Sequence, residues 1–173
     1  MKATPNQIQP NPRSSQIAPE SRAARMLREV FESGRPLTYL RTSEEQRAGN
    51  VLREAALRLF AQHPPVPVWT WSLTHGLHRD GAHAEAGTHD PQQALEFIAA
   101  HKQEGIFHLK DFHEPLRESA AIRRHLRDLY ESCRGQRKFV VITSPVRAIP
   151  EELERNLLFL ELRPPDIVEL MEF

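Results

Sequence analysis

Short apolar runs alternate with amphipathic helical patterns along the 173 residues, and this alternation constrains the fold more than any other feature. Each run is bounded by proline, glycine or polar residues, as short buried strands are. The sequence predicts five such strands, at residues 37–40, 66–71, 106–109, 139–142 and 157–162. Nearly continuous apolar strands are typical of parallel sheets that are covered on both faces.

Helical patterns fill the intervals between these strands. Ser21 has the character of an N-cap, and Gly34 followed by Pro36 provides stop signals, so we predict a first helix at 21–33. Further helices are predicted at 43–62, 91–102, 116–133 and, as a short one, from Pro150 onward. Strands that alternate with helices imply right-handed βαβ crossovers. We therefore predict an α/β protein with a three-layer, doubly wound, mainly parallel five-stranded sheet.

The two ends of the sequence differ from the domain between them. Residues 1–20 are rich in Pro, Asn, Gln and Ser and carry little branched apolar surface, which predicts a disordered N-terminal arm. The α/β domain is predicted at 21–163. Pro164 and Pro165 close the last strand, and an apolar run then begins at Asp166. Residues 164–173 are interpreted as a linker and the start of a following helix in a longer protein, or alternatively as a short C-terminal helix on the sheet.

Charge and hydropathy exclude several classes of function. Lys plus Arg and Asp plus Glu both total 23, so the formal net charge is zero and no global field attracts nucleic acid or an anionic membrane. The sequence has neither a signal-peptide pattern nor an apolar run near the roughly 20 residues that span a bilayer. We expect a cytoplasmic protein without membrane contact. The single cysteine, Cys133, is interpreted as an idle, partly buried thiol.

The first strand leads into a segment where a nucleotide-binding α/β protein would carry its phosphate loop. Such a loop needs glycines, a lysine and a hydroxyl residue, because backbone N–H groups and a cation must reach the phosphates. Here Arg41, Thr42 and Ser43 are followed by Glu44 and Glu45, with no glycine before position 49. Carboxylates at a helix N-terminus suit the helix dipole and take the place of the anion. We predict a capped helix, with Ser43 or Thr42 as N-cap.

The third and fourth strands end in polar residues at positions that matter in ATPases. The third strand has the shape of a Walker B strand, but Lys110 stands where a magnesium-linked carboxylate belongs, and Asp111 follows it. Lys110 could hold a phosphate or pair with Asp111. Thr143 and Ser144 end the fourth strand, where related ATPases sense the γ-phosphate. Together these positions define a vestigial nucleotide site: Arg41, Thr42, Ser43, Lys110, Asp111, Thr143 and Ser144.

Two strings, Trp-Ser-Leu-Thr-x-Gly-Leu at 71–77 and Leu-Lys-Asp-Phe-His at 109–113, resemble a known family. They are similar to the N-terminal region of an uncharacterised reading-frame family of AAA ATPases, found in bacteria, especially cyanobacteria, and in algal chloroplast genomes. In that family a degenerate RecA-like or AAA-like domain precedes the active AAA module. Residues 36–40 with Glu44 and Glu45, 68–77, 90–98, 105–113 and 140–145 carry the resemblance.

The resemblance implies a P-loop NTPase-like fold with a degenerate phosphate loop. It also implies that the parent family uses ATP and magnesium through a second half that carries Walker A, Walker B and an arginine finger. None of the motifs of that half occurs in these residues. We therefore expect no cofactor and no catalytic residue in this chain, and AAA subunits or other proteins as its partners.

Three further groups of residues are candidate binding sites. Histidines interleaved with carboxylates could hold a divalent metal, although their spacing matches no standard site: His75, His78, His83 and His89. Trp69 and Trp71, two apart, should share one strand face as core residues, with base stacking as the alternative. A basic cluster could contact an acidic partner or nucleic acid, or form a solvated face: Arg123, Arg124, Arg127, Arg134, Arg137 and Lys138.

These observations leave three functional hypotheses. The first is a non-catalytic domain of an AAA-type ATPase that serves assembly, partner recognition or regulation. The second is a nucleotide-binding ATPase domain that needs residues from another subunit, with Arg41, Lys110 and Asp111 as its active residues. The third is a nucleic-acid-associated module that acts through the basic cluster, which the zero net charge does not support.

Overall fold

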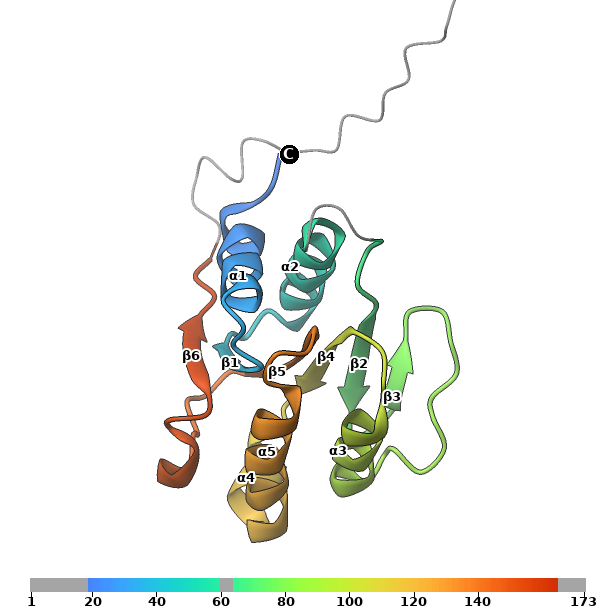
Figure 1. The fold of residues 1–173 in the computed structure, drawn as a ribbon. Helices are drawn as coiled ribbons and strands as arrows, with labels where there is room; N and C mark the ends of the chain where they lie inside the picture. Colours follow the sequence, from blue (N-terminus) through green and yellow to red (C-terminus); the bar gives the residue numbers. More distant parts are fainter. Residues whose placement is uncertain (1–18, 60–63, 165–173) are drawn as a thin grey trace, which may run out of the picture.

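The computed structural model describes residues 19–59 and 64–164, which form three layers around a central sheet (Figure 1). One face of the sheet carries α1 (Arg22–Glu32) and α2 (Glu45–Arg58), and the other carries α3 (Pro91–Ala100), α4 (His113–Glu118) and α5 (Ala120–Cys133). Residues 1–18 of the arm predicted at 1–20, the predicted helix end at 60–62 and the stretch 165–173 lie outside the described residues.

Within the described residues the sheet has six strands in the order β3-β2-β4-β5-β1-β6. They are β1 (Leu37–Arg41), β2 (Val68–Ser72), β3 (Gly76–Arg79), β4 (Gly105–Lys110), β5 (Lys138–Ser144) and β6 (Leu158–Glu161). All neighbouring strands are parallel except β2 and β3. The predicted three-layer, mainly parallel α/β class is confirmed, and the predicted count of five strands is corrected to six.

The strand that the sequence did not predict is β3, an antiparallel edge strand. It contains only one strongly apolar residue, Leu77, so it lacks the apolar run that identified the other strands. The turn before it is closed by a hydrogen bond from the His75 N–H to the Ser72 carbonyl (3.2 Å). Thr88 joins the loop after β3 to the sheet. Its hydroxyl accepts a hydrogen bond from the Leu77 N–H of β3 (2.8 Å), and its carbonyl accepts one from Trp71 Nε1 of β2 (2.6 Å).

Helix α1 begins and ends where its sequence signals predict. The Ser21 hydroxyl accepts a hydrogen bond from the Ala24 N–H (3.2 Å), and Gly34 adopts a φ of 80° just after the helix. The buried face of α1 presents Leu27 and Phe31, and the Phe31 ring stacks on Phe139 of β5 at a centroid distance of 4.8 Å. This contact fixes α1 against the sheet.

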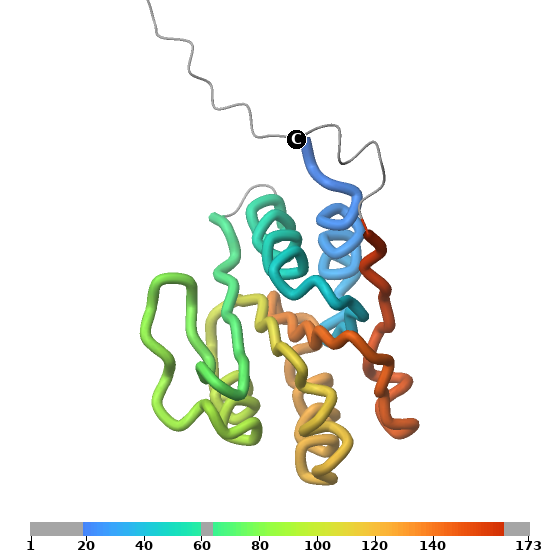
Figure 2. The backbone as a smooth tube through the Cα atoms, turned by 180° about the vertical axis from the view of Figure 1, so that it is seen from behind, coloured from blue at the N-terminus to red at the C-terminus, as the bar shows by residue number. Residues whose placement is uncertain are grey.

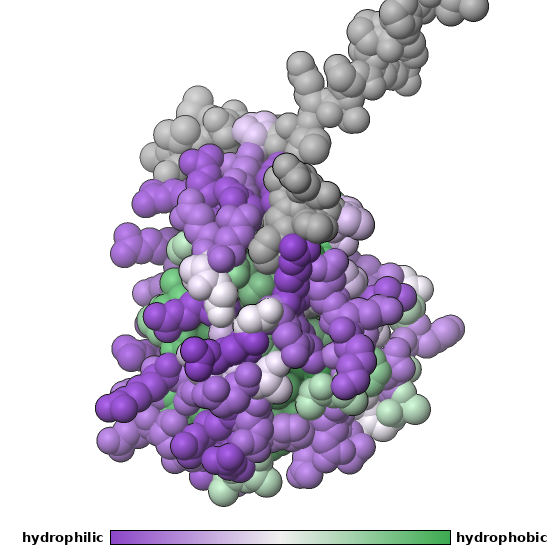
Figure 3. Space-filling view, viewed as in Figure 1, coloured by the Kyte–Doolittle hydropathy of each residue, from purple (hydrophilic) through white to green (hydrophobic). Residues whose placement is uncertain are grey.

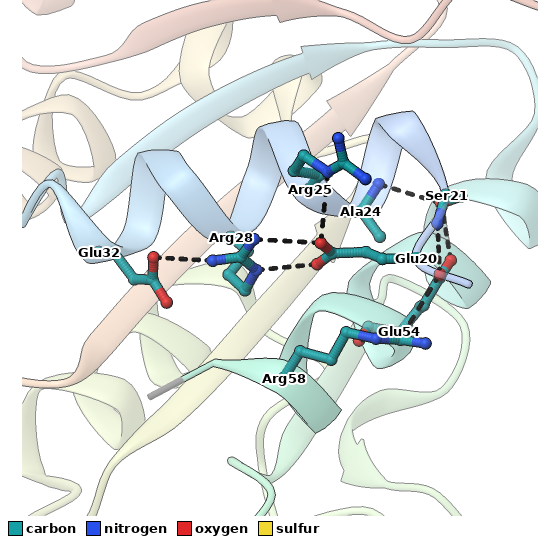
Figure 4. Close-up of polar contacts among 8 residues, drawn as sticks. All are labelled: Glu20, Ser21, Ala24, Arg25, Arg28, Glu32, Glu54 and Arg58. Atoms are coloured by element: carbon teal, nitrogen blue, oxygen red, sulfur yellow. Dashed lines mark hydrogen bonds and ion pairs between the residues drawn. The ribbon is translucent and has the colours of Figure 1, made fainter. Parts of the chain in front are cut away.

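Polar contacts fix the start of α1 to α2 (Figure 4). The Ser21 N–H and hydroxyl both donate to the Glu54 carboxylate, at 2.7 Å each. Arg28 donates to both oxygens of Glu20, at 2.8 and 3.1 Å, and this hydrogen bonding lowers the pKa of Glu20 below its usual value. Glu20 therefore belongs to the folded unit, although the sequence placed it in the arm.

The predicted helix at 116–133 is two helices. Ser119 adopts an extended backbone (φ −122°, ψ 115°), and its hydroxyl accepts from the Ile122 N–H (3.3 Å) as the N-cap of α5. The preceding helix, α4, begins at His113 and contains Pro115 in its first turn. Proline is tolerated there because the first N–H groups of a helix make no hydrogen bond within the helix. The short predicted helix after Pro150 is a 3₁₀ turn, η1 (Glu151–Leu153).

Each face of the sheet buries its own hydrophobic core, and Figure 2 shows the two helical layers from behind. Leu27, Leu52 and Val141 belong to the core under α1 and α2. Trp69 and Trp71 belong to the other core, under α3 and α5, and are 6% and 1% exposed. Their shared, buried face confirms the prediction that both tryptophans are core residues.

The parallel strands direct their carboxyl ends to one edge of the sheet, where the connections to α2, α4 and η1 leave it. In open α/β sheets this edge is where ligands bind. No helix among the described residues is long and apolar enough to cross a membrane.

Candidate functional site

The carboxyl edge of β1, β4 and β5 brings together the residues that the sequence assigned to a vestigial nucleotide site. The backbone ladder joins Arg41 to Ser144 and Lys110 to Thr143 as register partners. Two further hydrogen bonds extend it, from Thr42 N–H to the Ser144 carbonyl (2.8 Å) and from Asp111 N–H to the Thr143 carbonyl (2.9 Å). The seven positions thus line one continuous edge.

The connection from β1 to α2 occupies the position of a phosphate loop but is built differently. Thr42 is buried, and its hydroxyl accepts from the Glu44 N–H (3.0 Å), which makes a local turn before the helix. Glu44, not Ser43 or Thr42, is the N-cap residue, and its side chain makes no capping bond. Glu45 is the first helical residue, so its carboxylate lies at the positive end of the helix dipole.

Lys110 pairs with Glu45 rather than with Asp111. The distance from Lys110 Nζ to Glu45 Oε2 is 3.5 Å, with the two side chains 29% and 47% exposed. The sequence left open whether Lys110 holds a phosphate or pairs with Asp111, and the carboxylate beside it in the structure is that of Glu45. Asp111 adopts a left-handed backbone, with φ of 51°, directly after β4, and its carboxylate lies 3.9 Å from His113 Nδ1.

A buried polar pair lies beneath this ion pair, on the face of the sheet that carries α2. His108 Nε2 and the Thr143 hydroxyl are 2.9 Å apart, and both residues are 1% exposed. Burial, together with the smaller effect of the nearby positive charges of Lys110 and Arg53, lowers the pKa of His108 to about 3. His108 is therefore neutral at physiological pH. The Thr143 hydroxyl therefore makes a hydrogen bond to His108 inside the protein.

Hydrogen bonds within the protein also hold the loop that follows β5. The Ser144 hydroxyl donates to the Val146 carbonyl (3.0 Å) and accepts from the Val146 N–H (3.1 Å). The Tyr39 hydroxyl donates to the same carbonyl (2.6 Å) and accepts from the Ala148 N–H (3.2 Å). Of the two hydroxyls predicted to sense a phosphate, that of Ser144 thus holds the turn that leaves β5, together with Tyr39, whereas that of Thr143 contacts His108.

The charges along the edge are largely paired. Arg41 lies 3.7 Å from Glu161 of β6, at a solvated position, and Lys110 pairs with Glu45. His113, only 7% exposed, has Nε2 3.1 Å from Glu114 and a buried Nδ1 without a hydrogen-bond partner, 3.9 Å from Asp111. The described residues contain no cluster of three His, Cys, Asp or Glu side chains that could hold a metal ion.

The histidines after β2 are dispersed along the turn, β3 and the loop. His75 Nδ1 lies 2.8 Å from the Thr74 hydroxyl, and His78 Nδ1 lies 3.3 Å from the Gly76 carbonyl. The ring of His89 lies near Gly76, while His83 is exposed in the loop. In the described part of the chain, none of the four weak candidates, His75, His78, His83 and His89, belongs to a metal-binding group.

The basic cluster does not form one surface. Lys138 is 3% exposed, and its ammonium group donates to the carbonyls of Ile98 (3.0 Å) and His101 (2.7 Å) at the end of α3. It therefore stabilises a helix C-terminus and is not available to a partner, which corrects its assignment to that face. Four of the other members lie on α5 or just after it, at Arg123, Arg124, Arg127 and Arg134, and Arg137 precedes β5.

Cys133, the last residue of α5, is 1% exposed. Burial raises the pKa of its thiol, which keeps it in the unreactive protonated form. The prediction of an inert thiol agrees with this environment.

A sequence model of the SpoVK-like AAA ATPase N-terminal domain matches residues 23–162, which is most of the chain and nearly all of the described fold. The chain belongs to this N-terminal domain family. The matched segment begins within α1 and ends just after β6, so its limits coincide with those of the folded unit.

Two relatives of this chain carry the name of an AAA domain-containing protein. The chain is 31% identical over 137 residues to the uncharacterized AAA domain-containing protein ycf46 of Guillardia theta, covering 78% of this chain and 26% of the relative. It is 28% identical over 146 residues to ycf46 of Pyropia yezoensis, covering 83% and 29%. The chain thus spans between a quarter and a third of the length of these relatives. The predicted resemblance to the N-terminal domain of this AAA family is confirmed.

The sequence predicts the edge but not three side chains that lie at it or beside it. His108 and Tyr39 were read only as strand residues, although a polar side chain within a buried strand signals an internal hydrogen bond. Arg147 lies in the loop after β5 and was not nominated. Its position directly beyond a strand end was the available signal.

Proposed function

We propose that this SpoVK-like N-terminal domain is non-catalytic and serves its AAA ATPase in assembly, partner recognition or regulation. The observation that carries the proposal is the position of Glu44 and Glu45 at the start of α2, where a phosphate would need bare N–H groups and a lysine. Like charges at this helix end would repel a nucleotide phosphate.

The surrounding contacts support the same conclusion. The lysine at this edge, Lys110, is 3.5 Å from Glu45, and the hydroxyl of Thr143 is 2.9 Å from His108. A nucleotide would have to displace both contacts. A magnesium ion would meet the Lys110 ammonium group at the place where an active ATPase offers a carboxylate.

The alternative of a nucleotide site completed by another subunit would use Arg41, Lys110 and Asp111. Arg41 and Lys110 each lie within ion-pair distance of a carboxylate of the same chain, Glu161 and Glu45. Both pairs are solvated and therefore weak, so a phosphate could compete for them. This competition makes a direct binding measurement decisive.

Thermal melting with increasing ATP and magnesium tests the proposal. We expect no concentration-dependent rise in Tm up to millimolar ligand, because a ligand that binds only the native state must raise Tm. The matched variants are Lys110→Met at the edge and Lys102→Met, an exposed lysine just after α3. A rise in Tm that grows with ligand concentration, and that Lys110→Met removes while Lys102→Met keeps it, would contradict the non-catalytic assignment.

A further inference from the structure

A hollow of about 380 Å³ lies beside the carboxyl edge, between the α4–α5 helices and the segment that follows β5. Three arginines line it, Arg117, Arg123 and Arg147, together with one carboxylate, Glu152 of η1. Residues 148–150 give it an apolar wall, and Ile149 packs on the core beneath. Figures 1 and 2 both show the turn of η1 beside α5.

Arg123 forms a fixed side of this hollow. Its Nε donates to Glu152 at 2.6 Å, and one terminal nitrogen donates to the carbonyls of Leu116 (2.9 Å) and Arg117 (3.2 Å). The latter two carbonyls belong to the end of α4. Arg123 therefore joins α5 to α4 and η1, and its charge is already matched by Glu152.

Arg147 is presented differently, with its charge unmatched. Its guanidinium lies over the Phe159 ring, 4.6 Å from the centroid, and within the described residues it has no carboxylate partner. Stacking on a ring leaves the N–H groups at the edge of the guanidinium able to bind a carboxylate. Arg117, the third arginine, is 3.4 Å from Glu114 with both side chains more than half exposed, so this pair exchanges readily.

The segment that carries Arg147 is already ordered. Tyr39 holds the backbone on both sides of Arg147 through Val146 and Ala148, and the Leu153 N–H donates to the Pro150 carbonyl (2.9 Å). An arginine on a fixed backbone loses less conformational freedom when it binds than one on a mobile loop. The hollow is thus preformed on three sides.

We propose that this hollow binds an acidic segment of a protein partner. A carboxylate of the partner bridges Arg147 and Arg117, and an adjacent apolar side chain packs on Ile149 and Pro150. A peptide suits the hollow better than a polyphosphate strand, because a peptide can place an apolar side chain on Ile149 and Pro150 beside its carboxylate. Every unit of a phosphate strand instead brings a charge, which Glu114, Glu152 and the neighbouring Glu151 would repel. The proposal concerns a surface separate from the nucleotide edge and holds whether or not that edge binds ATP.

Fluorescence anisotropy with defined probes tests this proposal. The first probe is a fluorescein-labelled twelve-residue peptide in which glutamates alternate with leucines. We expect saturable binding, and a loss of about tenfold in affinity for Arg147→Gln and for Arg117→Gln. The control variant is Arg124→Gln, because Arg124 is 65% exposed on α5 and does not line the hollow. Its affinity should match that of the unmodified chain.

Several results would overturn the proposal. Absence of saturable binding, or an equal loss for Arg124→Gln, would mean that the hollow is not the docking surface. Equal affinity for a labelled dodecathymidylate would point instead to a general polyanion site. Displacement of the peptide by millimolar inorganic phosphate would indicate a small-anion site. Melting curves of each variant show that a lost signal reflects the surface, since Arg147→Gln and Arg147→Lys should both melt close to the unmodified chain.

Discussion

Two ionisable side chains of the central strands lie inside the protein, and their environments differ. Lys138 lies at the carbonyl end of α3, where three backbone oxygens at 2.7 to 3.5 Å accept hydrogen bonds from its ammonium group. His108 instead lies 2.9 Å from the Thr143 hydroxyl and remains neutral. A cation at a helix C-terminus is stabilised by the helix dipole, whereas a buried imidazole avoids its charged form.

His108 should make the fold sensitive to mild acid. Its pKa is about 3 in the folded protein and lies near 6.5 in the unfolded chain, so only the unfolded chain binds the proton between these values. Stability is therefore complete above about pH 6.5 and is lost as the pH falls toward 3, at about 1.4 kcal/mol per pH unit. From pH 7 to 5 this amounts to roughly 2 kcal/mol.

Denaturant unfolding of His108→Gln at pH 7 and pH 5 measures this contribution. The loss of stability between the two pH values should be smaller in His108→Gln than in the unmodified chain. His83→Gln, which removes a histidine from the exposed loop, serves as the control for the number of histidines. An identical pH dependence in all three proteins would refute the assignment of acid sensitivity to His108.

The sequence predicted which residues reach the carboxyl edge but not how they pair. Lys110 and Thr143 were placed there because strand ends are visible as the ends of apolar runs. The partner of Lys110 is Glu45, which is distant in sequence, and the partner of Thr143 is His108 on the neighbouring strand. Such pairs follow from strand order and register, which a single sequence with five similar strands does not specify.

At the scale of elements, α2 retains the position of a phosphate-binding helix while its first turn is acidic. Gly49 lies in the interior of this helix, and a Cβ at this position would lie 3.7 Å from the nearest atom, on the flexible Arg53 side chain. That distance is an ordinary van der Waals contact. The helical backbone therefore accepts alanine at this position without strain.

Gly49→Ala should stabilise the protein by about 0.5 to 1 kcal/mol, because alanine loses less conformational entropy in a helix than glycine. For a domain of this size the corresponding rise in Tm is about 1 to 4 °C. Gly34→Ala is the matched control: its φ of 80° is strained for alanine, and we expect Tm to fall although there is space for a methyl group. A lower Tm for Gly49→Ala would show that the start of α2 needs the flexibility of glycine.

Element boundaries were predicted well where local chemistry sets them. Ser21 and Gly34 define α1 through a cap and a left-handed residue, and both signals are local. The division between α4 and α5 at Ser119 also has a local signal, an N-cap serine, but the apolar spacing continues across it and suggests one helix. Strand β3 has no such signal, because it pairs only at the sheet edge and one apolar residue suffices there.

At the scale of the whole molecule, opposite charges are interspersed rather than separated. The view in Figure 3 is mostly hydrophilic, and the described residues expose only three large hydrophobic side chains to a high degree: Leu57, Leu73 and Val146. On and after α5, Arg124 pairs with Asp128 (2.6 Å), Arg134 with Glu131 (3.5 Å) and Arg137 with Glu104 (3.6 Å). Each of these three arginines is therefore accompanied by a carboxylate that would repel an approaching phosphate backbone.

This distribution of charge leads us to expect weak binding of nucleic acid. In about 0.15 M salt, a labelled 30-nucleotide DNA should bind with a Kd no tighter than about 10⁻⁴ M, because the net charge is zero and local carboxylates oppose phosphates. Arg124→Glu and Arg134→Glu should change this affinity little, since the surface there is already balanced. Anisotropy titrations between 0.05 and roughly 0.2 M salt measure the effect. Micromolar affinity with a steep salt dependence that both variants abolish would instead favour a nucleic-acid module on α5, and would require the carboxylates beside these arginines to move aside on binding.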